Sequence, residues 1–339
     1  MSILDNTSLK EYNTFGIDVS AQKFCIVKSK EDVQQLIQKQ FMSFRKHLFL
    51  GSGSNILLCN DVEGLVIKNE INGIEIVDED ENTVTIKSLS GTIWHDLVLF
   101  CVERNFGGIE NLSLIPGTVG AAPMQNIGAY GVELKDTFVE LEAINLKTAE
   151  LEIFTKESCQ FGYRESIFKK EAKGKYFIYS VTFKLSKQPK ANIAYGDIQK
   201  ILEAKFITNP MIKDVSDAVI EIRQSKLPNP KMLGNAGSFF KNPEVGLEVA
   251  ENIKKEFPEM PKYDLPNGTV KIPAAWLIEQ CGWKGKQVGN TGNHAKQALV
   301  IVNYGNATGH EIWQHALAVQ KSVKEKFGVL LEPEVNVIA

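Results

Sequence analysis

The first run of residues that could bind a ligand is Gly51-Ser52-Gly53-Ser54-Asn55, which directly follows the apolar stretch His47–Leu50. Two glycines let the backbone approach a ligand closely, and consecutive N–H groups with two hydroxyls suit a phosphate or pyrophosphate. The run matches neither common nucleotide fingerprint, because no glycine stands three residues after Gly53 and no Gly-Lys-Ser/Thr ending is present. A tight surface loop explains the same residues equally well.

A second tract, residues 115–131, is rich in Gly and Ala and carries no charged residue. Its small side chains leave room for a flat, bulky ligand, and exposed amides with Gln125 or Asn126 can bind the polar edge of that ligand. A buried Gly-rich crossover is the structural alternative. One loop for phosphates and one for a large ring system together indicate a dinucleotide flavin, bound in a way that differs from the Rossmann fold.

Three further polar residues could take part in catalysis, and each also has an ordinary structural explanation. Arg164 lies among aromatics and could clamp a carboxylate with both arms of its guanidinium, or it could pair on the surface with Glu165 or Glu171. Ser238 stands between a flexible turn and an apolar strand, outside any G-x-S-x-G elbow, so acyl transfer is not indicated. Glu332 precedes a proline that forces an extended backbone, and we expect its carboxylate to be half-buried.

Two histidines near the C-terminus, His310 and His315, resemble a zinc-ligand pair but have the wrong spacing. Residues five apart on a helix lie about 140° apart around its axis, whereas ligation from one face needs a spacing of four. We therefore expect both histidines on the helix surface and no metal site. Arg223 and Lys226, three apart near the end of another helix, share a face and could either bind an anion or compensate the helix dipole.

The composition narrows the class of protein. A chain of 339 residues exceeds one ordinary domain, so two or three domains are expected. The 38 basic and 41 acidic residues give a net charge of -3, which offers no electrostatic argument for a nucleic-acid or membrane partner. No apolar run approaches the roughly 20 residues that span a bilayer, and the N-terminal residues lack the features of a signal peptide. Five scattered cysteines without C-x-x-C spacing predict buried, reduced thiols in the cytoplasm.

Strands and helices that could position these residues follow from hydrophobic periodicity. The first sixty residues predict a βαβ unit whose helix begins after Ser29 and ends at about Gln40. Thr308 is expected to cap the last helix and Gly328 to end it. Pro228, Pro230 and Gly234 predict a boundary between domains. Strands are expected at 23–28, 47–50, 64–68, 83–87, 138–146, 176–185, 238–240 and 298–302, and further helices at 93–104, 215–226, 245–257, 274–281 and 311–327.

Five segments, taken in order, make the chain resemble the MurB family of UDP-N-acetylenolpyruvoylglucosamine reductases: IPGTVGAAPMQNIGAYGVE, FGYRES, KLPNPK, NAGSFFKNP and LEPEV. The resemblance covers nearly the whole chain. It implies an α+β protein of three domains, with a vanillyl-alcohol-oxidase-type FAD-binding fold made of two domains and a smaller α+β substrate-binding domain. The implied boundaries are 1–68 for the first part of the FAD-binding domain, joined by a returning strand at 329–339, then 69–227 for its second part and 228–328 for the UDP-sugar domain.

The resemblance also implies roles for individual residues. Arg164, Ser238 and Glu332 match the catalytic positions of the family. Residues 191–197 resemble the tyrosine-bearing segment of one of its two subtypes, in which Tyr195 would fold over the bound substrate. Tightly but non-covalently bound FAD would contact Gly51, Ser52, Gly53, Ser54, Asn55, Ile115, Pro116, Gly117, Thr118, Gly120, Ala121, Gln125, Asn126, Gly128, Ala129 and Tyr130. The UDP-sugar would contact Tyr195, Lys226, Asn242, Tyr263, Lys284 and Gln297.

The reaction implied is the reduction of UDP-N-acetylglucosamine enolpyruvate to UDP-N-acetylmuramate, a step of peptidoglycan precursor synthesis. NADPH would reduce the flavin, which would then pass hydride to the terminal carbon of the enolpyruvyl group. Arg164 would stabilise the negative charge that spreads into the carboxylate, Ser238 would donate the proton, and Glu332 would polarise or orient the intermediate. The protein is expected to be a cytoplasmic monomer with no nucleic-acid or membrane partner.

Two other functions compete with this interpretation. Another flavin oxidoreductase of the same fold, acting on an alcohol or a sugar, would not need Ser238 and Glu332. A non-enzymatic nucleotide-sugar sensor would keep the binding loops but could lose any of the three catalytic matches, all of which are present.

Overall fold

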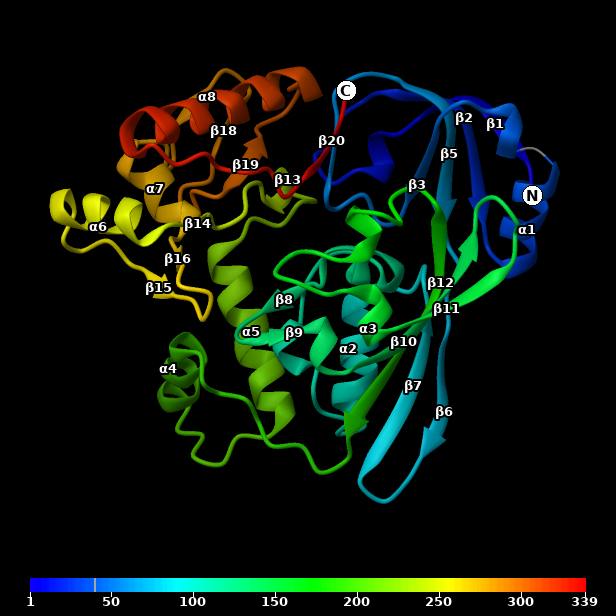
Figure 1. Ribbon diagram of the computed structural model, residues 1–339, viewed down its shortest axis with the longest axis horizontal. Coiled ribbons are helices and arrows are strands. Elements are labelled where there is room, and N and C mark those ends of the chain that lie inside the picture. The colour runs from blue at the N-terminus through cyan, green and yellow to red at the C-terminus, as the bar shows by residue number, and fades with distance from the viewer. Residues whose placement is uncertain (40) are drawn as a thin grey trace. The chain divides into compact units, whose positions relative to one another are not determined.

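The computed structural model describes residues 1–39 and 41–339, which form mixed helices and strands (Figure 1). These residues divide into two compact units. The first unit comprises Met1–Thr7, Ala21–Ser52 and Glu63–Ser225, and the second comprises Ser8–Ser20, Gly53–Val62 and Lys226–Ala339. None of the helices formed by the described residues is long and apolar enough to cross a membrane.

A four-stranded sheet built almost wholly from the first unit has the order β1-β2-β5-β3. Strand β3 pairs in parallel with β5, and the predicted apolar face of α1 is buried through Val33, Leu36 and Ile37. The strands and helix of the expected βαβ unit are therefore present, with β5 lying between β2 and β3, while the end predicted at Gln40 lies outside the described residues. The elements are β1 (Ile3–Ser8), β2 (Ser20–Val27), α1 (Lys30–Lys39), β3 (His47–Leu50) and β5 (Val62–Asn69).

The main sheet of the first unit is antiparallel and has the order β11-β10-β12-β7-β6. Its core includes Trp94 of α2 and Phe183 of β12, whose rings meet edge to face with centroids 5.8 Å apart. The predicted strands at 83–87, 138–146 and 176–185 and the helix at 93–104 are confirmed within a few residues, whereas β6 and β11 were not expected. The bounds are β6 (Ile74–Glu79), β7 (Thr83–Leu89), α2 (Trp94–Glu103), β10 (Phe138–Asn145), β11 (Leu151–Thr155) and β12 (Tyr176–Ser186).

Two further helices of the first unit, α4 (Gly196–Ala204) and α5 (Ile212–Lys226), bury a separate apolar cluster that includes Leu202 and Val219. Helix α5 matches the predicted helix at 215–226, and α4 was not expected. The remaining short elements of this unit are η2 (Phe41–Ser43), η3 (Glu110–Leu112), η4 (Val119–Gln125), β8 (Gly128–Ala129), β9 (Val132–Glu133), η5 (Leu134–Asp136), α3 (Lys156–Cys159) and η6 (Ile167–Lys169).

The second unit contains short antiparallel strands and three helices around one apolar core. Its sheets have the orders β13-β19-β18-β17 and β14-β16-β15, and the last strand, β20, pairs in parallel with β4. The bounds are η1 (Lys10–Tyr12), β4 (Ile56–Leu58), β13 (Gly234–Ser238), β14 (Glu244–Val245), α6 (Leu247–Glu256), β15 (Tyr263–Asp264), β16 (Val270–Lys271), α7 (Ala274–Gln280), β17 (Gln287–Val288), β18 (Thr291–Asn293), β19 (Val300–Asn303), α8 (Gly309–Phe327) and β20 (Asn336–Ile338).

Helix α8 has the predicted cap at Thr308 and the predicted end before Gly328, and it begins two residues before the expected 311. The Thr308 hydroxyl accepts from the N–H of Glu311 at 3.2 Å, and the Glu311 carboxylate accepts from the N–H of Thr308 at 2.7 Å, so the two residues form a capping box. Gly328 ends the helix with a φ of 70°, in the left-handed region that glycine adopts without steric cost.

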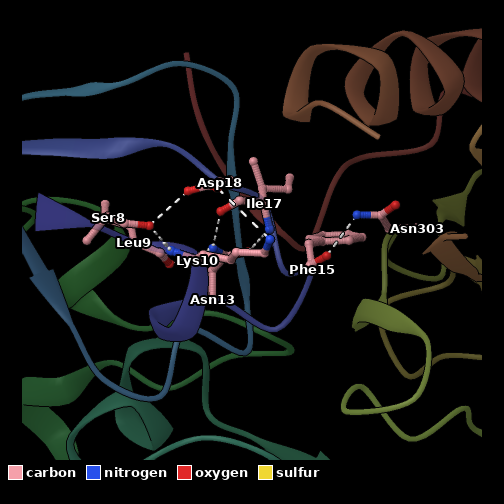
Figure 2. Close-up of polar contacts among 8 residues, drawn as sticks. All are labelled: Ser8, Leu9, Lys10, Asn13, Phe15, Ile17, Asp18 and Asn303. Atoms are coloured by element: carbon pink, nitrogen blue, oxygen red, sulfur yellow. Dashed lines mark hydrogen bonds and ion pairs between the residues drawn. The ribbon is translucent and has the colours of Figure 1, made fainter. Parts of the chain in front are cut away.

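Residues 8–20 belong to the second unit and are held by polar contacts, several of which Figure 2 shows. The buried Asn13 amide donates to the carbonyls of Leu9 and Ile17, and its oxygen accepts from the N–H of Ile17. The Asn303 amide donates to the carbonyl of Phe15 at 3.0 Å, as Figure 2 shows. These bonds hold the segment that packs against one of the predicted ligand loops.

Candidate active site

The first half of the predicted phosphate loop lies in the first unit beside the second predicted tract. A Cβ placed on Gly51 would lie 2.7 Å from the Thr118 hydroxyl, so only a glycine permits this approach without displacing the threonine side chain. Two segments that sequence reasoning assigned to one ligand are therefore in contact.

The second half of that loop lies in the second unit and is held by two distant segments. Gly53 has a φ of 66°, and a Cβ there would lie 2.0 Å from the carbonyl oxygen of Tyr12. Its own carbonyl accepts from the N–H of Thr14 at 3.1 Å. The Asn55 amide donates to the Glu334 carbonyl at 3.2 Å, and Ser54 is buried. A glycine is thus required at Gly53, and the loop is fixed before any ligand binds.

Residues 117–120 of the second tract form backbone hydrogen bonds with residues 90–94, the segment that leads into α2. Gly117 accepts from the N–H of Trp94 at 3.0 Å, and the N–H of Gly120 donates to the Ser90 carbonyl at 2.9 Å. A Cβ on Gly120 would lie 2.5 Å from the Cβ of Ser90. Other predicted FAD contacts of this tract are at least partly exposed: Ile115, Pro116, Gly117, Gly120, Ala121, Gln125, Gly128, Ala129 and Tyr130.

Asn126 is the predicted FAD contact whose side chain is fully buried. Its amide donates to the Glu133 carboxylate at 3.1 Å and to the Gly162 carbonyl at 3.0 Å, while its oxygen accepts from the N–H of Lys135 at 3.0 Å. The residue has a φ of 43°, a conformation that asparagine tolerates better than most side chains. Its side chain therefore stabilises the loop by joining it to neighbouring segments, and its contact with FAD stays a prediction.

Arg164 lies at the corner of a tight turn in which Gly162 and Glu165 exchange backbone hydrogen bonds. Its φ of 54° is strained for a residue with a long side chain. The guanidinium Nη2 donates to the Gly128 carbonyl at 2.6 Å. The Glu165 carboxylate, offered by the sequence as a surface partner for Arg164, lies 3.9 Å from Lys170 Nζ. The turn thus directs Arg164 toward the predicted flavin tract.

Ser238 and Glu332 lie on neighbouring segments of the second unit. The N–H of Lys241 donates to the Glu332 carbonyl at 2.9 Å, and the N–H of Glu334 donates to the Phe239 carbonyl at 2.8 Å. This antiparallel ladder fixes the register between the two predicted catalytic residues. Strand β13 ends at Ser238, so the strand expected at 238–240 lies earlier in the chain.

The expectation of a half-buried Glu332 carboxylate is wrong, because this side chain is 71% exposed. Its neighbour Leu331 is fully buried, and consecutive side chains of extended backbone point to opposite sides. The carboxylate lies 3.6 Å from Lys241 Nζ.

Four of the predicted UDP-sugar contacts lie on two parts of the second unit, two in or beside the sheet β14-β16-β15 and two in or beside the segments that bond to Asn293. Asn242 accepts from the N–H of Ala274 at the start of α7, at 2.9 Å, and directly precedes the small sheet that carries Tyr263. Lys284 forms an isolated bridge with Asn293, and the Asn293 amide donates to the carbonyl of Ala298, the residue after Gln297. Tyr263 is 60% exposed. Lys284 Nζ also lies 2.9 Å from the Glu279 carboxylate.

The other two predicted contacts lie apart from these pairs in the chain. Tyr195 is in the first unit, directly before α4, and its ring meets the Tyr130 ring edge to face with centroids 5.1 Å apart. Lys226 is the last residue of α5 and the first residue of the second unit's longest stretch.

Arg223 holds the predicted flavin tract rather than leaving its charge free at the helix end. Its Nε donates to the Leu114 carbonyl at 3.1 Å, where Leu114 itself has a φ of 57°. Burial lowers the pKa of the Arg223 guanidinium, and a hydrogen bond with Tyr130 opposes that shift. The two explanations left open by the sequence therefore gain a third, structural one.

The prediction that both C-terminal histidines lie on the helix surface is wrong for His315, which is buried, and correct for His310. His315 Nε2 lies 2.8 Å from the Asn293 amide oxygen, and its Nδ1 lies 3.0 Å from the Thr291 hydroxyl. Burial, with a smaller contribution from Lys286, lowers the pKa of His315 to about 4. His315 stands three residues after the buried Ile312, so helical periodicity contained the signal of its burial.

Four of the five cysteines are buried as predicted, and Cys281 is only partly buried. Burial is the main cause that raises the pKa of the Cys25 thiol to about 11 and that of Cys101 to about 12. These thiols are unreactive at neutral pH and belong to the cores of the molecule.

Two family models match the chain: an FAD binding domain over residues 21–153, and the C-terminal domain of UDP-N-acetylenolpyruvoylglucosamine reductase over residues 229–338. A protein of Flavobacterium johnsoniae named UDP-N-acetylenolpyruvoylglucosamine reductase is 53% identical over 339 residues, which is 100% of both chains. One of the same name from Amoebophilus asiaticus is 50% identical over 338 residues, again covering 100% of each.

Among solved structures, the UDP-N-acetylenolpyruvylglucosamine reductase of Thermus caldophilus is similar to this chain with a TM-score of 0.66 and 24% identity. The likeness covers 100% of this chain and 98% of that one. It confirms the expected α+β fold, and the FAD binding domain model agrees with the flavin indicated by the two loops.

Proposed function

The chain belongs to the UDP-N-acetylenolpyruvoylglucosamine reductase family, and we propose that it reduces UDP-N-acetylglucosamine enolpyruvate to UDP-N-acetylmuramate with FAD as cofactor and NADPH as reductant. The finding that carries this proposal is the full-length similarity to reductases of that name. The product would feed peptidoglycan synthesis. We place the reaction in the cytoplasm, in a monomer, as expected from the scattered thiols and the balanced charge.

The residues of the two predicted loops fit a flavin. The absence of a Cβ at Gly51 allows the first loop to lie against Thr118 of the second, and Ala121 gives that second tract a small exposed side chain. When bound, FAD supplies the hydride carrier between NADPH and the substrate. The protein's part is to hold the ligand through backbone amides and to exclude bulky side chains from the loops.

Arg164 is proposed to bind the enolpyruvyl carboxylate and to stabilise the negative charge that grows there during reduction. Its bond to the Gly128 carbonyl uses one arm of the guanidinium and orients the group before substrate binds. A preoriented cation stabilises developing charge without reorganisation during the reaction. Strained backbone residues cluster at active sites, where the surrounding structure enforces them. The positive φ of Arg164 therefore supports this role.

Ser238 is proposed to donate the proton that completes the saturated product, and Glu332 to orient the reacting group. A neutral serine is a weak acid, so it can act only when placed against a strongly basic carbon. The backbone bonds between 239–241 and 332–334 fix the register of the two segments that carry Ser238 and Glu332, which supports these roles. Lys241 Nζ lies 3.6 Å from the Glu332 carboxylate and places a positive charge beside this residue.

Binding of the UDP-sugar is proposed for Tyr195, Lys226, Asn242, Tyr263, Lys284 and Gln297. The exposed Tyr263 ring and the Lys284 ammonium supply a stacking surface and a positive charge. The three-domain division at 1–68, 69–227 and 228–328, with 329–339 returning to the first part, is retained as part of this proposal.

The test is the visible absorption spectrum of the purified protein, followed under anaerobic conditions by NADPH and then by UDP-N-acetylglucosamine enolpyruvate. We expect a flavin spectrum that bleaches with NADPH and recovers when the substrate is added. Bleaching without recovery would leave the flavin fold intact and favour an oxidoreductase for an alcohol or sugar. Substrate binding without any flavin reduction would favour a nucleotide-sugar sensor.

A further inference from the structure

Asn111 is a buried amide that bonds to two segments far apart in the sequence. It lies in η3 and is 1% exposed. Its Nδ2 donates to the Tyr130 carbonyl at 3.2 Å and to the Asn192 carbonyl at 3.0 Å. Both N–H groups of one amide are therefore used to join the predicted flavin tract to the segment that carries Tyr195.

The orientation of this amide follows from its partners. Both neighbours are carbonyl oxygens, which only accept hydrogen bonds, so the NH₂ group and not the oxygen must face them. The Asn111 Oδ1 is consequently buried without a hydrogen-bond partner among the described residues. A buried acceptor without a partner is costly, and its retention indicates that the two donated bonds matter more than the lost one.

The segment that Asn111 reaches depends on this bond. For residues 189–194, all of them described, the bond to the Asn192 carbonyl is the one hydrogen bond to another element. The Asn192 side chain accepts from the N–H of Ala194, which folds the segment locally. Ile193 packs against the apolar cluster of α4 and α5, beside Tyr130.

Tyr130 is the second point at which the two segments meet. Its φ of 50° holds the residue in a left-handed conformation, and its ring contacts the Tyr195 ring edge to face. The Asn111 bond to its carbonyl supports this strained backbone. The same amide thus bonds directly to Tyr130 and to Asn192, three residues before Tyr195.

We propose that Asn111 is a positioning residue for substrate binding: it fastens residues 189–194 to the flavin tract and so gives the segment a fixed base from which Tyr195 folds over the UDP-sugar. This inference rests on the proposed function for the identity of the substrate. The fastening itself concerns only the contacts among Asn111, Tyr130 and Asn192. It predicts that loss of the amide loosens the segment even when no substrate is present.

The first experiment measures that loosening by limited proteolysis with trypsin of the FAD-loaded protein. Asn111→Leu keeps the approximate volume and removes both donors, and Asn111→Ala serves if the leucine variant does not fold. We expect cleavage after the exposed Lys190 to become about fivefold faster, the factor for loss of one ordinary hydrogen bond. Cleavage after Lys205, at the far end of α4, is the internal reference.

Ser216→Ala is the matched control, because it also removes a buried polar group near η3. The Ser216 hydroxyl lies 2.8 Å from the hydroxyl of Ser113, and it has no bond to the 189–194 segment. We expect this control to leave cleavage after Lys190 unchanged relative to Lys205. Equal acceleration in the control and in Asn111→Leu would overturn the fastening role, since general destabilisation would then explain both.

The second experiment separates the proposal from the proposed function. We expect Asn111→Leu to raise the KM for UDP-N-acetylglucosamine enolpyruvate five- to tenfold while kcat changes less than twofold. In a Tyr195→Ala background the same substitution should have no further effect on KM, because the residue it places is gone. An undiminished effect in that background would refute action through Tyr195. A wild-type protein that does not reduce the substrate would instead refute the proposed function, and the proteolysis result would still stand.

Discussion

In the first unit, the polar side chains assigned to the site are bonded to the protein, whereas in the second unit the assigned side chains are largely exposed. The Asn126 side chain bonds to Glu133, Gly162 and Lys135, and Arg164 donates to the Gly128 carbonyl. Tyr263 and Glu332, by contrast, are 60% and 71% exposed. The side chains proposed as ligand contacts are thus better ordered by the protein at Asn126 and Arg164 of the first unit than at Tyr263 and Glu332 of the second.

The two units also use their backbones differently. Around the predicted flavin tract, Leu114, Asn126, Tyr130 and Arg164 all have positive φ although none is glycine. Each such residue costs on the order of 1–3 kcal/mol and persists only where neighbours enforce it. In the second unit, Ser238 and Glu332 are placed by an extended ladder. Strain accompanies order in one unit, while strand register alone positions the residues in the other.

The largest expected effect is on the second unit's serine. Ser238→Ala should slow flavin reoxidation by UDP-N-acetylglucosamine enolpyruvate by about 10² to 10⁴-fold, the range typical for a lost general acid. Rapid-mixing absorbance of the flavin measures this rate. Flavin reduction by NADPH should keep its wild-type rate and serves as the internal control. Normal rates in both half-reactions would show that Ser238 is not the proton donor.

The next effect concerns the first unit's arginine. Arg164→Lys should slow the same reoxidation step by about 10²-fold, because a lysine cannot bond to Gly128 and a carboxylate with a planar fork. Arg104→Lys is the matched control, since Arg104 also donates to a backbone carbonyl, that of Phe100 at 3.0 Å, on another part of this unit. Full activity of Arg164→Lys would show that the bond to Gly128 has only a structural role and that the guanidinium does not stabilise the substrate carboxylate.

Periodicity predicted most of the regular elements because local sequence determines them. Helix α8 has the predicted cap at Thr308 and the predicted end at Gly328, and β3 matches its predicted bounds. Periodicity missed the short strand β4 because its pairing partner, β20, lies 280 residues further along the chain and leaves no local pattern, whereas β20 itself lies within the returning strand that the resemblance implied at 329–339.

The candidate site was predictable where residue type limits conformation and not where packing decides. Gly51 and Gly53 occupy positions where a Cβ would collide, so their type carried the information. The exposure of Glu332 depends on which side of an extended segment faces the core, and the single neighbouring Leu331 decides that. The bridging role of Asn111 could not be predicted, because both of its partners are backbone carbonyls, which every residue has.

The smallest effect expected here is on stability and arises from the buried His315 of the second unit. Its pKa is lowered to about 4 in the folded protein, so the unfolded chain binds the proton more readily between about pH 6.5 and pH 4. Stability is therefore fully present above pH 6.5 and is lost as the pH falls. Between pH 7.5 and pH 5 the loss attributable to His315 should be about 2 kcal/mol.

Urea unfolding of the wild type and of His315→Gln at both pH values measures this loss, because glutamine has no titrating group but retains an amide near Asn293 and Thr291. Protonation of carboxylates also lowers the free energy of unfolding as the pH falls. The quantity to compare is therefore the pH-dependent change in this free energy between wild type and His315→Gln. His310→Gln, on the exposed side of α8, should keep the wild-type pH dependence. If His315→Gln kept it as well, the folded protein would bind the imidazole proton as readily as the unfolded chain does. At pH 5 the imidazole would then donate from both nitrogens, and the Thr291 hydroxyl would donate to the Val288 carbonyl 3.0 Å away. The second unit would in that case hold a buried charge in a hydrogen-bonded network at pH 5, as the first unit does at Arg223.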